Sequence, residues 1–223
     1  MIGVAREDGL WTVTLDRPDK ANALTEAMLT ELVDIAEAAQ GEARALILTG
    51  AGKVFSAGAD LEAARAGLAR SPVWERLSGA IAALPCLTVA ALNGTVAGGA
   101  LGMVLACDLR IAAAGAGAFY PVMRLGFRPQ PSDPARLAAL VGPSRAKMIL
   151  LAGQKVTTDE ALAWGLFDRV VPRETLIENA RGLVADSLGT TPGHARALKA
   201  MCGAADAHGG GSTGSTSCAC PLG

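Results

Sequence analysis

The feature that most constrains this 223-residue chain is the stretch from residue 87 to 109, which reads LTVAALNGTVAGGALGMVLACDL. A β-rich run at Leu87–Leu92 is followed by a turn at Asn93-Gly94, a small-residue passage through Gly98-Gly99, and an apolar helical run. This order points the backbone N–H groups of a helix N-terminus into a concave space, which favours an anion or a polarised carbonyl oxygen. Because glycine has no Cβ, a ligand can also approach this backbone closely. The alternative is that Gly98-Gly99 only lets a strand and a helix pack tightly.

Strand-like and helix-like patterns alternate along the chain. Residues 10–16 alternate between apolar and polar side chains like a half-buried strand, whereas residues 45–49 form the continuous apolar run of a buried parallel strand. Further short strands are expected at 109–112 and 166–171. Segments with helical periodicity or capping residues lie at 25–36, 62–84 with an interruption at Ser71-Pro72, 135–141, 144–151, 159–164, 174–188 and from 192 onward. This alternation predicts an α/β fold with a parallel sheet and crossover helices.

Composition and charge argue against several other classes of protein. The length suffices for one α/β domain, and because only 4% of residues are aromatic, Ala, Leu and Val must fill its core. A net charge of −1 without a basic stripe argues against nucleic acid as a partner. No apolar run reaches the roughly 18 residues that a membrane span needs, and the first residues lack a signal-peptide pattern. The five cysteines and two histidines fit no zinc-site spacing, so we expect no bound metal and a reducing, cytoplasmic location.

The end of the chain differs in composition from the rest. Residues 208–223 are rich in Gly, Ser and Thr and show no apolar periodicity, which is typical of disorder. We therefore expect a folded domain at residues 1–201 and a disordered tail at residues 202–223.

Five short segments stand in a characteristic order. They read RPDKANAL at 17–24, FSAGADL at 55–61, NGTVAGGALG at 93–102 with Cys107-Asp108, YP…LGF at 120–127, and ALAWGLFDRVVP at 161–172. Together they resemble the crotonase superfamily, the enoyl-CoA hydratase/isomerase family, over roughly residues 10–199. The resemblance implies a spiral of ββα units, here with a truncated or atypical C-terminal helical region. It also implies a homotrimer or dimer of trimers that acts as a lyase or isomerase in fatty acid metabolism.

The resemblance also implies a substrate and a site. The substrate would be an acyl-CoA thioester, with coenzyme A as part of the substrate and no permanently bound cofactor. By motif position, the backbone N–H groups of Ala59 and Gly99 would form an oxyanion hole for a thioester enolate, and such donors are worth a few kcal/mol each in a dry site. The other expected CoA- and substrate-binding positions are Lys20, Ala21, Ala57, Gly58, Asp60, Leu61, Gly98 and Val122. Lys20 would meet a CoA phosphate or lie in a solvated turn, and Asp60 has the alternative role of a helix N-cap.

The chain departs from the family at the two positions that carry proton transfer in its hydratases. Those enzymes use two glutamates, and this sequence has Gly102 and Val122 there. Neither side chain can move a proton, so hydration by paired carboxylates is not expected. Asp133 is the candidate acid or base, with the alternative role of N-cap for the helix that follows it. Cys107 lies in an apolar run without a neighbouring histidine, which argues against a nucleophile.

Two functions follow from this departure. The first is a reaction through a thioester enolate that does not use the glutamates, such as isomerisation, decarboxylation or hydrolysis. The alternative is a non-catalytic acyl-CoA binding or assembly protein. Asp108 matches a position shared widely in the family, and we expect it to act as a structural cap or ion-pair residue.

Overall fold

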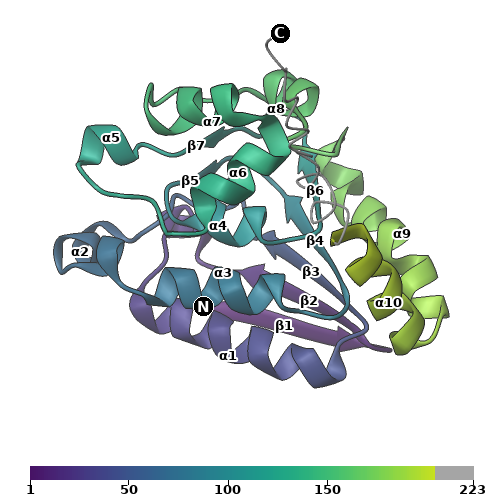
Figure 1. The fold of residues 1–223 in the computed structure, drawn as a ribbon. Coiled ribbons are helices and arrows are strands. Elements are labelled where there is room, and N and C mark those ends of the chain that lie inside the picture. Colours follow the sequence, from purple (N-terminus) through teal and green to yellow (C-terminus); the bar gives the residue numbers. More distant parts are fainter. Residues whose placement is uncertain (204–223) are drawn as a thin grey trace, which may run out of the picture.

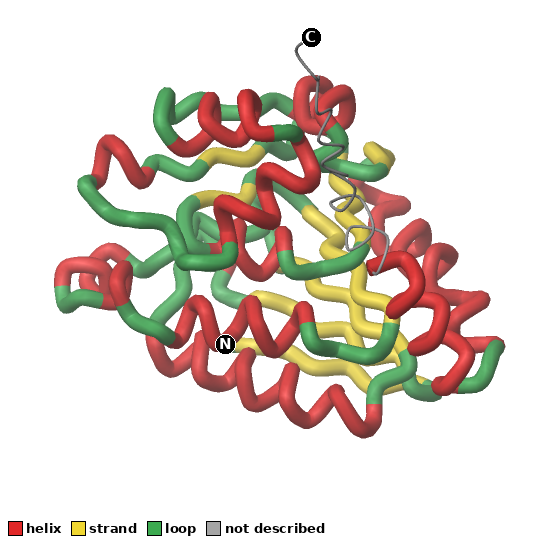
Figure 2. Tube along the Cα trace, viewed as in Figure 1, coloured by secondary structure: helices red, strands yellow, loops and turns green. Residues whose placement is uncertain are grey.

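The computed structural model describes residues 1–203, and it is built on one six-stranded sheet and a small second sheet (Figures 1 and 2). The large sheet has the order β1-β2-β3-β4-β6-β8, in which β1 is antiparallel to β2 and all other neighbours are parallel. The small sheet pairs β5 with β7 in parallel. The strands are β1 (Ile2–Glu7), β2 (Leu10–Leu15), β3 (Ala45–Gly50), β4 (Leu87–Leu92), β5 (Val96–Ala97), β6 (Leu109–Ala113), β7 (Ala118–Phe119) and β8 (Arg169–Val171).

Helices connect the strands and cover both faces of the large sheet (Figure 1). They are α1 (Glu26–Glu42), α2 (Leu61–Arg65), α3 (Val73–Ala82), α4 (Ala100–Leu105), α5 (Val122–Leu125), α6 (Asp133–Val141), α7 (Pro143–Leu150), α8 (Thr158–Trp164), α9 (Leu176–Gly189) and α10 (Pro192–Gly203). Short 3-10 turns stand at η1 (Pro18–Lys20), η2 (Leu68–Arg70) and η3 (Arg173–Thr175). None of the helices in residues 1–203 combines the length and the apolar character that a membrane crossing requires.

The core lies on the two faces of the parallel strands. On one face, α1, α3 and α4 pack together over side chains such as Leu48 and Leu92. On the other face, α9 packs against β3, β4 and β6 and covers Ile47 and Val89. Strands β3 and β4 are therefore buried on both sides, which explains their unbroken apolar sequences.

Two loops that follow neighbouring parallel strands are tied together at one edge of the sheet. The Nδ2 atom of Asn93, just after β4, donates to the carbonyl oxygens of Gly52 and Val54, just after β3. A Cβ added at Gly94 would stand 2.0 Å from the carbonyl oxygen of Lys53, so only glycine allows this close approach. This contact brings together the segments that the sequence analysis assigned to the site.

The α/β fold and most of its elements agree with the sequence. The strands expected at 10–16, 45–49, 87–92 and 109–112 are confirmed, and Thr25 caps α1 as expected. Strand β1 was not expected, because it is an exposed edge strand without apolar alternation. The strand expected over 166–171 is confined to β8, because Leu166 and Phe167 are buried in the turn that leads to it.

Three boundaries differ from the expectation. The helix expected over 62–84 also breaks before Ser71-Pro72, at Gly67, whose φ of 105° is incompatible with a continuing helix. The N-cap of α6 is Ser132, and Asp133 is the first helical residue, so the N-cap role suggested for Asp133 is wrong. Helix α10 runs to Gly203, two residues beyond the expected domain boundary, and the rest of the expected tail lies outside the described residues.

Candidate active site

The first candidate donor, the N–H group of Ala59, lies in the loop between β3 and α2. The N–H groups on either side of it are both used, since Gly58 N donates to Ser56 Oγ at 3.1 Å and Asp60 N donates to the Leu24 carbonyl at 2.8 Å. The Ala59 N–H itself has no acceptor among residues 1–203. The loop therefore holds this one donor fixed and available.

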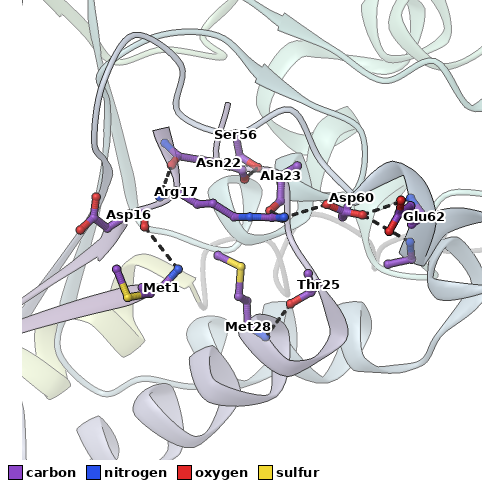
Figure 3. A network of polar contacts seen from close by, with 11 residues as sticks. Met1, Asp16, Arg17, Asn22, Ala23, Thr25, Met28, Ser56, Asp60 and Glu62 are labelled. Atoms are coloured by element: carbon purple, nitrogen blue, oxygen red, sulfur yellow. Dashed lines mark hydrogen bonds and ion pairs between the residues drawn. The ribbon is translucent and has the colours of Figure 1, made fainter. Parts of the chain in front are cut away.

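A polar network fixes the end of this loop (Figure 3). Arg17 Nη1 donates to Asp60 Oδ2 at 2.8 Å and to the Ala23 carbonyl at 3.0 Å. Asp60 Oδ1 accepts from the N–H groups of Glu62 and Ala63, which confirms Asp60 as the N-cap of α2. The hydrogen bond from Arg17 keeps the pKa of Asp60 below its usual value, so this carboxylate stays ionised and holds the loop.

The turn around Lys20 and Ala21 lies against the same loop. The Ala57 N–H donates to the Ala21 carbonyl at 2.9 Å, and Ser56 Oγ donates to the Asn22 carbonyl at 2.8 Å. Asn22 is fully buried, and its side chain donates to the carbonyls of two residues in the loop after β3. Lys20 is exposed beside this junction, where its ammonium group is free to meet an anion in solution.

The second candidate donor, the N–H group of Gly99, immediately precedes α4. The Gly98 N–H donates to the Phe119 carbonyl at 3.1 Å, and the Leu101 N–H donates to the Gly98 carbonyl at 3.0 Å. The Gly99 N–H has no acceptor in the described part of the chain. A Cβ added at Gly99 would stand 3.1 Å from the ring of Trp74, so the indole packs directly on this backbone.

The two donor loops run side by side. The Ala97 N–H donates to the Ser56 carbonyl at 2.9 Å, and residues 56 and 96 form a parallel bridge. A Cβ added at Gly58 would stand 2.8 Å from the Ala97 carbonyl oxygen, so a side chain there would push the loops apart. The unpaired N–H groups of Ala59 and Gly99 thus belong to adjacent segments.

Both donors line one cavity of about 340 Å³, whose wall is mainly apolar. The predicted positions Ala57, Leu61, Gly98 and Val122 also line it, and Val122 is buried there. Sequence reasoning had not placed Trp74 at the site, because only its packing on Gly99 brings it there. The lining residues with polar groups on their side chains are Arg65, Trp74, Tyr120, Arg128 and Gln130.

Asp133 fills the space next to Gly102. A Cβ added at Gly102 would stand 2.8 Å from Asp133 Oδ1 and 3.0 Å from Asp133 Oδ2. Tyr120 Oη donates to Asp133 Oδ2 at 2.8 Å, and Tyr120 is one of the residues that line the cavity. Asp133 is 1% exposed, and its Oδ1 atom is buried without a partner among residues 1–203.

Burial controls the ionisation of this pair. Desolvation raises the pKa of Asp133 from 3.8 to about 6, although the hydrogen bond from Tyr120 opposes the shift. Desolvation, assisted by the Asp133 charge, raises the pKa of Tyr120 far above its usual value, so the phenol stays protonated. At neutral pH the arrangement is a phenol that donates to a buried carboxylate.

Other candidate groups have structural roles. Asp108 Oδ2 accepts from Thr88 N, Thr88 Oγ1 and Lys199 Nζ, the last at 2.7 Å, which confirms its expected ion-pair role. Cys107 is buried, and burial raises the pKa of its thiol to about 12, which excludes a reactive thiolate. Within residues 1–203, no three His, Cys, Asp or Glu side chains gather to form a metal site.

The chain is similar to known proteins of one family in both sequence and structure. The family model described as enoyl-CoA hydratase/isomerase matches residues 5–208. A probable enoyl-CoA hydratase, echA6 of Mycobacterium bovis, is 36% identical over 171 residues, which cover 76% of this chain and 70% of the relative. A 4-chlorobenzoyl coenzyme A dehalogenase of an Arthrobacter species is 34% identical over 209 residues, with 88% and 75% covered. The crystal structure of an enoyl-CoA hydratase from Bacillus anthracis superposes with a TM-score of 0.82 at 32% identity, covering 91% of this chain and 82% of that chain.

Proposed function

This chain belongs to the enoyl-CoA hydratase/isomerase family, and we propose that it binds an acyl-CoA thioester with the thioester oxygen between the N–H groups of Ala59 and Gly99. The observation that carries the proposal is the pair of unpaired N–H groups on adjacent loops, both at the wall of one apolar cavity. Donors fixed in this way stabilise the negative charge that develops on the oxygen when the thioester becomes an enolate.

The remaining predicted positions suit the two ends of such a substrate. The side chains of Leu61 and Val122 lie where an acyl chain would pass, because both line the apolar cavity. The Ala21 carbonyl accepts from Ala57 N, and Lys20 is the exposed residue before Ala21. A CoA phosphate bound beside this loop would therefore meet the Lys20 ammonium group. Coenzyme A enters and leaves with the substrate, so the proposal includes no permanently bound cofactor.

The proposal also includes an oligomeric state and a location in the cell. We expect a homotrimer or dimer of trimers in the cytoplasm, as the family resemblance implies. Sedimentation of the purified chain measures the first of these predictions.

The test of the oxyanion site is a pair of substitutions at Gly99. Its φ of −58° is compatible with both proline and alanine, and both add a Cβ against Trp74, but only proline removes the N–H group. We expect Gly99→Ala to keep the infrared shift of a ¹³C-labelled thioester carbonyl on binding and Gly99→Pro to lose it. Turnover, where a reaction is found, should fall about 100-fold or more in Gly99→Pro relative to Gly99→Ala. A carbonyl shift that is the same in both variants would contradict the proposed donor.

A second function, acyl-CoA binding without catalysis, is favoured by one observation. Gly102 and Val122 stand where hydratases of the family carry glutamates, so the usual proton-transfer groups are absent from those positions. Binding with carbonyl polarisation but without any proton exchange would identify this function.

A further inference from the structure

We propose that the Tyr120 hydroxyl is the proton-transfer group of the cavity and that Asp133, which lies behind it, is the positioning residue that receives the tyrosine proton. The inference rests on the proposed function, because the proton it moves is the one next to the thioester carbonyl. In this proposal Tyr120 and Asp133 take the place of the two glutamates that the family's hydratases use. Tyr120 follows β7, and Asp133 is the first residue of α6; both elements are labelled in Figure 1.

The first supporting observation is the space that Gly102 leaves. Asp133 Oδ1 lies 2.8 Å from the point where a Cβ of residue 102 would stand, so a side chain at 102 would require the Asp133 carboxylate to move. The carboxylate therefore occupies the space beside α4 into which a side chain at position 102 would extend. In this chain a carboxyl group is present near that position, but it is supplied by α6.

The second observation is that Asp133 is incompletely satisfied. A buried carboxylate normally has partners for both oxygens, because an unpaired buried charge is costly. Here Oδ2 accepts from Tyr120, whereas Oδ1 has no partner within residues 1–203. The charge of Asp133 is therefore only partly compensated, and a buried carboxylate in this state is relieved of an unfavourable charge when it accepts a proton.

The third observation is the position of Tyr120 between the cavity and the carboxylate. Tyr120 lines the cavity that holds the unpaired N–H groups of Ala59 and Gly99, and its hydroxyl bonds directly to Asp133. Tyr120 thus joins the cavity to the buried carboxylate, and the proposed path of the proton runs through its hydroxyl group. Tyrosine is a known general acid or base when a partner takes or supplies its proton.

The step balances without an oxidant or a further reactant. The phenol oxygen of Tyr120 takes the proton from the carbon next to the thioester carbonyl while its own proton passes to Asp133 Oδ2. The electron pair of the broken C–H bond becomes the enolate, whose oxygen is held by the N–H groups of Ala59 and Gly99. The reverse transfer returns a proton to carbon, so the pair supports exchange or movement of a proton along the acyl chain.

The charged groups that face Asp133 set the pH at which the step can run. They are Tyr120 through its hydrogen bond, Glu75, whose charge raises the pKa of Asp133, and Arg136, whose charge lowers it. Glu75 is itself engaged by the backbone and side chain of Ser132, which keeps it beside the start of α6. Because Asp133 must be ionised to receive a proton, the rate should rise with pH to a plateau above the pKa of about 6.

The experiment measures proton exchange and binding separately. Purified full-length protein is incubated in deuterium oxide with saturated thioesters from acetyl-CoA to octanoyl-CoA, and deuterium at the carbon next to the carbonyl is followed by mass spectrometry. Calorimetry with the same thioesters measures binding. The variants are Tyr120→Phe and Asp133→Asn, with Asp168→Asn as a control that removes a carboxylate paired with Arg110 instead.

We expect both site variants to bind thioesters within about threefold of the wild type and to exchange about 100-fold or more slowly. The control should exchange at the wild-type rate, and Asp133→Glu should recover part of the rate lost in Asp133→Asn. The remaining exchange rate of Asp133→Asn should also no longer increase with pH.

Three results would overturn the inference. Exchange by Tyr120→Phe at the wild-type rate removes the tyrosine from the step, and an unchanged rate and pH profile in Asp133→Asn removes the aspartate. Thioester binding by the wild type with carbonyl polarisation and without exchange leaves the oxyanion site standing and ends the proton-transfer proposal. Absence of thioester binding in the wild type instead contradicts the proposed function on which this inference rests.

Discussion

Replacing Asp133 by asparagine should remove a loss of stability that the wild type undergoes as the pH rises from about 4 to neutral, and it should also remove activity. The pKa of this carboxyl group is raised from 3.8 to about 6, mainly by desolvation. Between pH 3.8 and pH of about 6, the Asp133 carboxyl group is therefore protonated more often in the folded chain than in the unfolded chain. The contribution of this group to the free energy of unfolding is greatest below pH of about 4 and is lost as the pH rises through about 6.

The size of the effect follows from the shift. One pKa unit corresponds to about 1.4 kcal/mol, so ionisation of Asp133 costs the folded state about 3 kcal/mol well above pH 6. About 1 kcal/mol of this is already lost at pH 4.5, and about 2 kcal/mol is lost between pH 4.5 and pH 8. Asparagine has nearly the same shape and no charge, so Asp133→Asn should be free of this loss.

The assay is urea unfolding followed by tryptophan fluorescence at pH 4.5 and pH 8, at one fixed protein concentration. The difference in unfolding free energy between Asp133→Asn and wild type should grow by about 2 kcal/mol from the lower to the higher pH. Asp60 and Glu160, whose pKa values are lowered, contribute oppositely in acid, but they are present in both proteins and cancel in the difference.

The variant Tyr120→Phe tests whether the stability changes with pH in the expected direction. The hydrogen bond from Tyr120 lowers the pKa of Asp133, so Tyr120→Phe should raise that pKa further, and the loss of stability should continue to higher pH and become larger in total. If wild type and Asp133→Asn lose stability in parallel between the two pH values, Asp133 is not the buried, desolvated carboxylate described above, and the reasoning fails.

Two further predictions concern packing and an ion pair. Gly102→Glu should lower the free energy of unfolding by about 1–3 kcal/mol, because its Cβ would stand 2.8 Å from Asp133 Oδ1, and the double variant Gly102→Glu/Asp133→Gly should recover most of this loss in the same urea assay. An additive double variant would show that the two positions do not compete for space. Lys199→Met should lower stability by about 1–2 kcal/mol and speed proteolysis within α10, because Lys199 Nζ bonds the Cys86 carbonyl and Asp108. The exposed Lys147→Met is the matched control, and equal proteolysis of both variants would contradict this role.

The motifs in the sequence, through the family resemblance, were sufficient to bring the two candidate donor loops to attention. Strands buried on both faces give continuous apolar runs, and Gly58 and Gly94, which let the loops approach each other, both stand in recognisable motifs. What it could not supply is that the N–H groups of Ala59 and Gly99 are unpaired. That property depends on where the neighbouring N–H groups find acceptors, and two of those acceptors, the carbonyls of Leu24 and Phe119, lie in distant segments.

The role of Asp133 could not be read from its own surroundings in sequence. An aspartate followed by proline at the start of a helical pattern is a typical N-cap, and local propensity favours that interpretation. In the structure, Ser132 takes the N-cap position, and the Asp133 side chain turns inward to Tyr120. The decisive contact is with Gly102, and a glycine leaves no sign in sequence that another residue needs its space.

The same contact changes how the missing glutamates should be tested. Restoring Gly102→Glu and Val122→Glu together would ordinarily ask whether the scaffold still supports hydration of an enoyl-CoA. Here the Cβ of a side chain at 102 would stand 2.8 Å from Asp133 Oδ1, closer than van der Waals contact, and the added carboxylate would be a second buried negative charge near Asp133. We therefore expect hydration to appear only in the triple variant that also carries Asp133→Gly. Hydration by the double variant alone would show that the Asp133 side chain can move away from Gly102, and its carboxylate would then not be fixed where proton transfer requires it.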